Sequence, residues 1–112
     1  MAPTVWYYVR DLDSARRFYR ETLLFAELLY DPDENWVTTE RGGMEIGLAV
    51  GEPSEDGVAH VDVDDLKAEA ERLRAAGVDV GIVVELGGEM RLLDVFDPDG
   101  NRLQFAQELR PA

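Results

Sequence analysis

A short motif occurs twice in this chain and constrains its fold more than any other feature. The motif begins at Val9 as Val-Arg-Asp-Leu and again at Val63 as Val-Asp-Asp-Leu. Each copy follows a short stretch of strand-like alternation and precedes a stretch with helical spacing. A repeat of about fifty residues indicates two similar structural units, and a binding site is then expected between them.

Both halves of the chain show the same order of helix and strand patterns. In the first half, a strand over 4–9 precedes a helix with an apolar stripe of Ala15, Phe18, Tyr19, Thr22 and Leu23. In the second half, a strand over 58–63 precedes a helix over 66–77 that ends at a glycine. Each half then predicts three more strands, at 25–30, 36–40 and 44–50 in the first and at 78–84, 90–96 and 102–107 in the second.

The length of 112 residues fits one domain with its own core. Within it we expect one unit over about 3–50, another over about 57–108, and a polar linker over 51–56. The absence of cysteine excludes disulfides, thiolate nucleophiles and Cys-ligated metals. No apolar run is long enough to span a membrane and no signal peptide is recognisable, so a cytoplasmic location is expected.

The net charge of −13 limits the partners of the chain. Phosphate backbones and anionic membrane surfaces would be repelled, so we expect neither nucleic-acid nor membrane binding. A small cation would be attracted. An acidic surface also keeps many proteins soluble without any further role, and composition favours that simpler interpretation.

Three motifs in order resemble the vicinal oxygen chelate superfamily, the glyoxalase, bleomycin-resistance and extradiol dioxygenase group. They are the first Val-x-Asp-Leu with Phe18-Tyr19, the second with Leu73 and Gly77, and the turn Asp97-Pro98-Asp99-Gly100-Asn101. The resemblance implies an α+β fold in which two tandem βαβββ modules form a curved half-barrel sheet around a cleft. It also implies a homodimer, because single-domain relatives build their clefts partly from both chains.

One segment departs from the pattern of the family. Members often have Leu-Gly-Phe after the first helix, where this chain has Leu23-Leu24-Phe25. Glycine readily adopts the left-handed conformation that ends many helices. We therefore expect that left-handed stop to be missing here, at a small cost in local stability.

Alternation along the strands separates the residues that face the helices from those that face the cleft. The helix-facing rows are Val5, Tyr7, Val9, Met44, Ile46, Leu48, Val50, Ala59, Val61, Val63, Leu103 and Phe105. The cleft rows are Thr4, Trp6, Tyr8, Gly43, Glu45, Gly47, Ala49, Val58, His60, Asp62, Arg102, Gln104 and Ala106. From these rows and a neighbouring strand we expect the ligand-binding residues Trp6, Tyr8, Trp36, Glu45, His60, Asp62, Arg102 and Gln104.

The resemblance also places the metal site of the catalytic relatives. Their four ligand positions, usually His or Gln, Glu, His and Glu, correspond by motif spacing to Thr4, Glu45, Val58 and Gln104. Of these, Glu45 is a strong ligand type, Gln104 a weak one, and Val58 cannot coordinate a metal. His60 lies two residues beyond Val58 on the same face and is a candidate displaced ligand. We therefore expect no bound metal and no other cofactor.

Three functions are compatible with these residues. The leading hypothesis is a metal-free protein that binds a small aromatic or cationic molecule, with drug sequestration as one role. An alternative is an enzyme, either a metal-dependent glyoxalase-like lyase, isomerase or ring-cleaving dioxygenase, or a metal-free enzyme with His60 or Glu45 as general base. A third is a regulatory module whose cleft is filled by its own side chains or by a partner chain.

Overall fold

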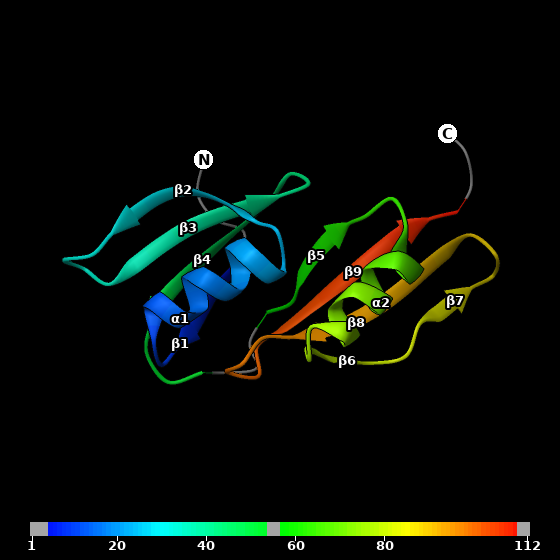
Figure 1. Ribbon diagram of the computed structural model, residues 1–112. Helices are drawn as coiled ribbons and strands as arrows, with labels where there is room; N and C mark the ends of the chain where they lie inside the picture. Colours follow the sequence, from blue (N-terminus) through cyan, green and yellow to red (C-terminus); the bar gives the residue numbers. More distant parts are fainter. Residues whose placement is uncertain (1–4, 54–56, 110–112) are drawn as a thin grey trace.

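The computed structural model describes residues 5–53 and 57–109, and its elements repeat one order in both halves (Figure 1). The first module contains β1 (Val5–Val9), α1 (Leu12–Arg17), η1 (Phe18–Thr22), β2 (Ala26–Asp31), β3 (Trp36–Arg41) and β4 (Met44–Val50). The second contains β5 (Ala59–Asp62), α2 (Leu66–Ala75), β6 (Asp79–Val80), β7 (Val84–Leu86), β8 (Met90–Phe96) and β9 (Arg102–Glu108). The expected α+β fold of two modules is confirmed. Thr4, expected to begin the first strand, lies outside the described residues.

Each module forms its own open sheet. The strand orders are β1-β4-β3-β2 and β5-β9-β8-β6, with β7 also paired to β8, and the first strand of each module runs parallel to its last. Both helices lie on the same side of the two sheets (Figure 1). The opposite side, which carries Trp6, Gly47, His60 and Gln104, has no helix over it, and we call it the cleft face.

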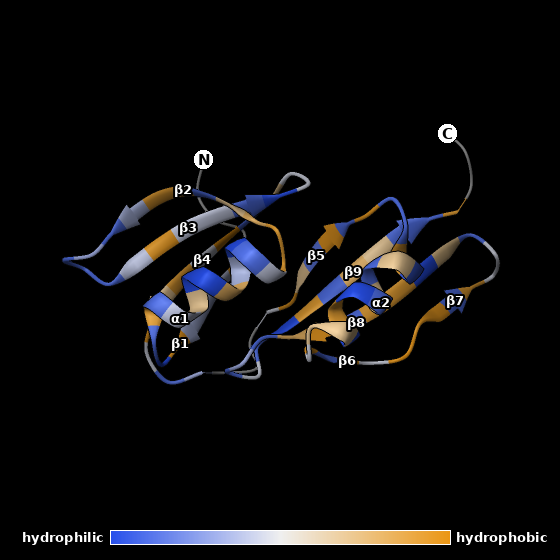
Figure 2. Ribbon diagram, viewed as in Figure 1, coloured by the Kyte–Doolittle hydropathy of each residue, from blue (hydrophilic) through white to orange (hydrophobic). Residues whose placement is uncertain are grey.

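The core lies between the helices and the sheets and follows the predicted alternation, which Figure 2 shows as hydropathy bands along the strands. Tyr7, Val9, Ile46, Leu48, Ala59, Val61, Leu103 and Phe105 are all buried. Three positions differ in exposure from the other members of their rows. Val50 is 47% exposed because it is the last residue of β4. In the cleft rows, Ala106 is buried because its small side chain lies between those of larger cross-strand neighbours, Asp62 and Leu92, and Gly47 is buried beneath the Trp6 ring.

The first helix begins at a capped residue and ends in a strained one. The Asp11 carboxylate accepts hydrogen bonds from two backbone amides of the first turn, as an N-cap should. The wide turn η1 follows, where the amide of Leu23 donates to the carbonyl of Phe18 at 3.0 Å. Leu24 then adopts a φ of 63°. The left-handed stop expected to be missing is therefore present, formed by a leucine that pays the steric penalty a glycine avoids.

The strand predicted over 78–84 is interrupted. β6 ends at Val80 and β7 begins at Val84, and their registers with β8 differ by one residue. Such a shift is a β-bulge, which bends a strand and changes its twist. Gly81 lies in the bulge, where its amide donates to the carbonyl of Asp94 at 2.9 Å.

The modules contact each other through reciprocal polar contacts, which we call the seam: Tyr7, Tyr19, Arg41, Glu69, Asp97 and Asn101. The β3–β4 turn of the first module reaches the second helix, where Arg41 pairs with Glu69. The β8–β9 turn of the second module reaches the first helix, where the Tyr19 hydroxyl donates to the Asp97 carboxylate at 2.8 Å. Each module thus uses one turn to hold the helix of the other.

Tyr7 joins the two sheets directly. Its hydroxyl accepts a hydrogen bond from the amide of Ala59 at 2.8 Å and donates to the carbonyl of Arg102. Burial disfavours the charged phenolate and raises the pKa of Tyr7 to about 12. The two modules are therefore connected within one chain by a buried, neutral phenol.

Candidate functional site

Three aromatic side chains on the cleft face of the first sheet, Trp6, Tyr8 and Trp36, form what we call the aromatic platform. Trp6 lies opposite Gly47 in the β1–β4 pair, and a Cβ on Gly47 would be only 2.4 Å from the Trp6 ring. Glycine at this position lets the indole lie against the backbone of β4. The Trp36 ring meets the Trp6 ring edge-on, with centroids 6.2 Å apart. Because Trp6 and Tyr8 are 42% and 44% exposed, much of their surface is available to a ligand.

The cleft face of the second sheet carries polar residues. His60, Gln104 and Asp94 occupy one row across β5, β9 and β8. The Asp94 carboxylate pairs with Arg102 at 3.1 Å. His60 is exposed, and its imidazole makes no hydrogen bond or ion pair with another described residue. A general base is normally held by an orienting partner, and His60 has none within the described part of the chain.

Negative charge collects on the cleft face. Among the basic residues of the described strands, Arg102 faces the cleft, whereas Arg41 and Arg91 share the rows of Met44 and Gln107 that face the helices. By contrast, the register places Glu40, Glu45, Asp62, Asp79 and Glu108 on the cleft face. No described basic side chain pairs with any of these five carboxylates. Because Asp94 neutralises Arg102, the face as a whole favours a cation.

The donor set does not fit the metal site of the catalytic relatives. Of the family positions within the described residues, Glu45 on β4 and Gln104 on β9 carry donor atoms, one from each sheet, and Val58 has none. Thr4, the fourth position, is outside the described residues. Residues 5–53 and 57–109 contain no group of three or more His, Cys, Asp or Glu side chains placed to hold one ion. A zinc or iron site needs three or four good protein donors.

Two buried acidic groups with raised pKa values lie in the seam. Desolvation raises the pKa of the Asp97 carboxyl, although it accepts hydrogen bonds from Tyr19 and from Asn101. Burial, followed by the nearby charge of Asp97, raises the pKa of the Tyr19 phenol well above its ordinary value. The sequence identified 97–101 only as a turn. The available signal was an Asp followed four residues later by Asn, since both side chains commonly bond turn amides.

Several hollows lie around the predicted site. One of about 260 Å³ is lined by Val58, Phe96, Gly100 and Arg102, and one of about 310 Å³ by Asp62, Val63, Asp64, Met90, Ala106 and Glu108. Another of about 450 Å³ lies beside the first turn of α1, and a fourth of about 430 Å³ lies between the helix ends. None of the four is lined by the aromatic platform, Glu45, His60 or Gln104. The structure thus brings the predicted residues onto one face of two sheets, where Arg102 and Asp62 each line a separate hollow and the other six line none of the four.

The sequence over residues 2–105 matches the family model of the Glyoxalase/Bleomycin resistance protein/Dioxygenase superfamily. The chain belongs to this superfamily, which confirms the resemblance drawn from its motifs. No curated protein matches the sequence. Within the described residues, no helix has the length and apolar character needed to cross a membrane.

Solved structures share the fold. Lactoylglutathione lyase from Agrobacterium tumefaciens superposes with a TM-score of 0.75 at 19% identity, covering 95% of this chain and 92% of the other. The antibiotic binding protein TnmS3 from Streptomyces sp. CB03234 gives a TM-score of 0.76 at 25% identity, with 96% of each chain covered. The fosfomycin resistance protein FosX from Listeria monocytogenes gives 0.76 at 17% identity, covering 96% and 91%. The fold therefore occurs in an enzyme and in proteins tied to antibiotics.

Proposed function

We propose that this superfamily member binds a small organic cation with an aromatic ring on its cleft face, without a metal, and acts by sequestration. One arrangement carries the proposal: the aromatic platform shares a face with carboxylates that no described basic side chain neutralises. A flat ring can stack on the exposed surface of Trp6 or Tyr8. The positive charge is attracted both by the indole faces and by Glu45 and the other unpaired carboxylates.

The glycine under Trp6 supports a binding role for the platform. Pre-set aromatic surfaces bind with less loss of conformational freedom than side chains that must first be ordered. The Trp6 ring rests on Gly47 and is braced by Trp36, so it is held in place before any ligand arrives. A tryptophan kept half-exposed in this way is suited to contact with a planar molecule.

We further propose that a second copy of the chain completes the site. The platform lines none of the four hollows, so a ligand there would gain a further wall from a partner. The cleft face also exposes Leu29 on β2 and Val84 and Leu86 on β7, near opposite ends of the molecule (Figure 1). Exposed apolar strips on edge strands are typical of interfaces. A homodimer formed through this face would bury them and enclose the platform.

One comparison and the donor set support sequestration. TnmS3, at 25% identity over nearly the whole chain, is named as an antibiotic binding protein. The donor set argues against the metal-dependent lyase, isomerase or dioxygenase alternative, since Glu45 is its one strong ligand among the described residues. For the metal-free enzyme alternative, His60 has no orienting partner in the described chain.

Tryptophan fluorescence offers a direct test, because both tryptophans of the chain lie on the platform. We expect 1-methylquinolinium, a flat cation, to quench the emission saturably and to bind more tightly than neutral quinoline. The anion 2-naphthoate should bind weakest. Calorimetry on the same samples should give the same order without depending on quenching.

Two variants separate specific from general charge effects. Glu45→Gln should weaken 1-methylquinolinium binding about threefold, as for a partly exposed ion pair. Asp33→Asn removes an equal charge from the exposed β2–β3 turn and should leave binding unchanged. Quenching that never saturates, or equal affinity for the three probes, would show that the face does not select cations. Stoichiometric Zn²⁺ binding that requires Glu45 would reject the metal-free assignment.

A further inference from the structure

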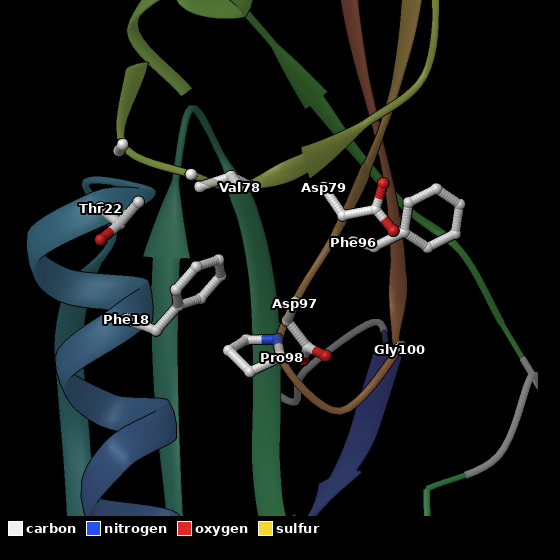
Figure 3. A pocket seen from close by; sticks show the side chains of 10 residues that line it. Phe18, Thr22, Val78, Asp79, Phe96, Asp97, Pro98 and Gly100 are labelled. Atoms are coloured by element: carbon white, nitrogen blue, oxygen red, sulfur yellow. The ribbon is translucent and has the colours of Figure 1, made fainter. Parts of the chain in front are cut away.

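One of the four hollows lies beside the seam, away from the aromatic platform. Its volume is about 430 Å³, within the range of small-molecule sites. Figure 3 shows the side chains of Phe18 and Thr22 from η1 facing Val78 across the opening, with the β8–β9 turn below. We call it the seam pocket, and it is lined by Phe18, Thr22, Ala76, Gly77, Val78, Asp79, Phe96, Asp97, Pro98 and Gly100.

The walls of the seam pocket combine apolar surface with negative charge. Phe18, Val78, Phe96 and Pro98 supply aromatic and aliphatic contacts, and Asp79 and Asp97 supply carboxylates. None of the ten lining residues is basic. Figure 3 places the Asp79 carboxylate beside the Phe96 ring, and this carboxylate has no ion-pair or hydrogen-bond partner among the described residues. The pocket therefore disfavours anions.

The charge of Asp97 is not compensated by a cation. Asp97 is only 4% exposed, and four donors from Tyr19, Asn101 and two turn amides occupy its oxygens. No described arginine or lysine forms an ion pair with it, although buried charges in proteins are usually paired. These hydrogen bonds hold the Asp97 carboxylate in place but do not neutralise its negative charge, which therefore acts on anything bound in the pocket.

Helix ends add to this negative field. The pocket lies at the C-terminal ends of η1 and α2, where the helix dipole is negative and favours cations. Arg72 does reach the carbonyl of Thr22, at 2.6 Å, but it also pairs with Glu69 and does not line the pocket. Two carboxylates and two helix ends thus all make the potential in the pocket more negative.

We propose that the seam pocket is a second binding site, which takes a small organic monocation bearing an aromatic or branched alkyl group. The apolar part packs between Phe18, Val78 and Pro98, and the cationic group lies toward the carboxylates. This site is distinct from the aromatic platform and from Glu45, none of which lines it, although Asp79 and Phe96 belong to the rows that end at the cleft face. Occupancy would bridge the two modules where their helices end.

Glycine amides provide reporters for an NMR titration of the full chain. Gly77 lines the seam pocket and none of the other three hollows, Gly100 lines both the seam pocket and the hollow beside Arg102, and Gly47 and Gly51 lie under Trp6 and Tyr8 on the cleft face. Titration with 2-phenylethylammonium should shift the Gly77 and Gly100 signals saturably. Neutral 2-phenylethanol should bind more weakly and 3-phenylpropanoate not at all.

Two variants test the pocket and its charge. Asp79→Asn should weaken 2-phenylethylammonium about threefold at the Gly77 signal and leave 2-phenylethanol unchanged, whereas Asp33→Asn should change neither. Val78→Trp should fill the cavity and abolish the shifts, with the remaining spectrum confirming the fold. Shifts confined to Gly47 and Gly51, no saturable shift with any probe, or equal binding of the anion would each overturn the proposal. Because the cleft reporters are read in the same spectra, failure here is distinguishable from failure at the platform.

Discussion

Replacing Gly47 by alanine should displace Trp6 and remove most ligand binding at the platform while keeping the fold. The φ of Gly47 is not left-handed, so alanine adds no backbone strain. Its new Cβ would nevertheless be 2.4 Å from two atoms of the Trp6 ring, whereas ordinary contact begins at 3.4 Å. The indole must therefore shift by about 1 Å or rotate into another rotamer.

The cost in stability follows from how much of Trp6 is covered. An aromatic side chain buries roughly 150–250 Å² when fully enclosed, and Trp6, at 42% exposed, loses somewhat over half of that contact if it swings out. At about 25 cal/mol per Å² the loss is about 2–4 kcal/mol when the ring swings out fully, and a partial shift costs about 1 kcal/mol. We expect unfolding to be easier by roughly 1–4 kcal/mol, within what a small domain tolerates.

Denaturant unfolding, tryptophan emission and near-UV circular dichroism measure these effects. In Gly47→Ala the tryptophan emission should move to longer wavelength. The near-UV circular dichroism that arises from the Trp6–Trp36 contact should weaken. Gly81→Ala is the matched control, because its Cβ would meet Asp94 at an ordinary 3.6 Å and its φ is also outside the left-handed region. Unchanged spectra and stability in Gly47→Ala, or equal losses in both variants, would refute the placement of Trp6 over Gly47.

Four further outcomes are expected. Leu24→Gly should be more stable than Leu24→Ala by about 1 kcal/mol in urea unfolding, since both lose the side chain but only glycine relieves the left-handed backbone; equal stabilities would exclude that strain. Tyr7→Phe should cost about 1–3 kcal/mol in thermal unfolding by leaving a buried amide of β5 unpaired, whereas Tyr8→Phe, which loses an exposed hydroxyl, should be nearly neutral. Because the pKa of Asp97 is raised, the folded state holds its proton to higher pH than the unfolded state, so stability relative to Asp97→Asn should rise as pH falls through that raised pKa; a flat difference would contradict it. In analytical sedimentation the wild type should be a dimer and Leu86→Glu a monomer, because the new charge would lie in the proposed interface. A monomeric wild type would contradict the proposed dimer.

Much of the fold could be predicted from local pattern. The repeated motif indicated two modules, because each copy marks the end of a strand and the start of a helix. Strand alternation placed Tyr7 and Ile46 in the core and Trp6 on the cleft face, since successive side chains in a strand point to opposite sides. These predictions succeeded because each depends only on residues close in sequence.

Other features depend on contacts between distant residues. Local propensity disfavours a left-handed Leu24, yet packing of both the helix and β2 overrides it. The interruption near Gly81 depends on register with β8, which no local pattern encodes. The site itself was only partly foreseen: the platform residues could be assigned to one face, but the resting of Trp6 on Gly47 requires the parallel pairing of β1 with β4.

The sequence by itself determined the superfamily, the modules, the facing of each strand and the poor metal-donor set, because these follow from residue type and spacing. Only the tertiary structure decided where the charge of −13 acts. Strand register turns unpaired carboxylates onto the cleft face and Arg41 and Arg91 away from it, and the seam buries Asp97 without a cationic partner among the described residues. Net charge is a sum over the chain, whereas an electrostatic field depends on which distant residues folding brings onto one surface.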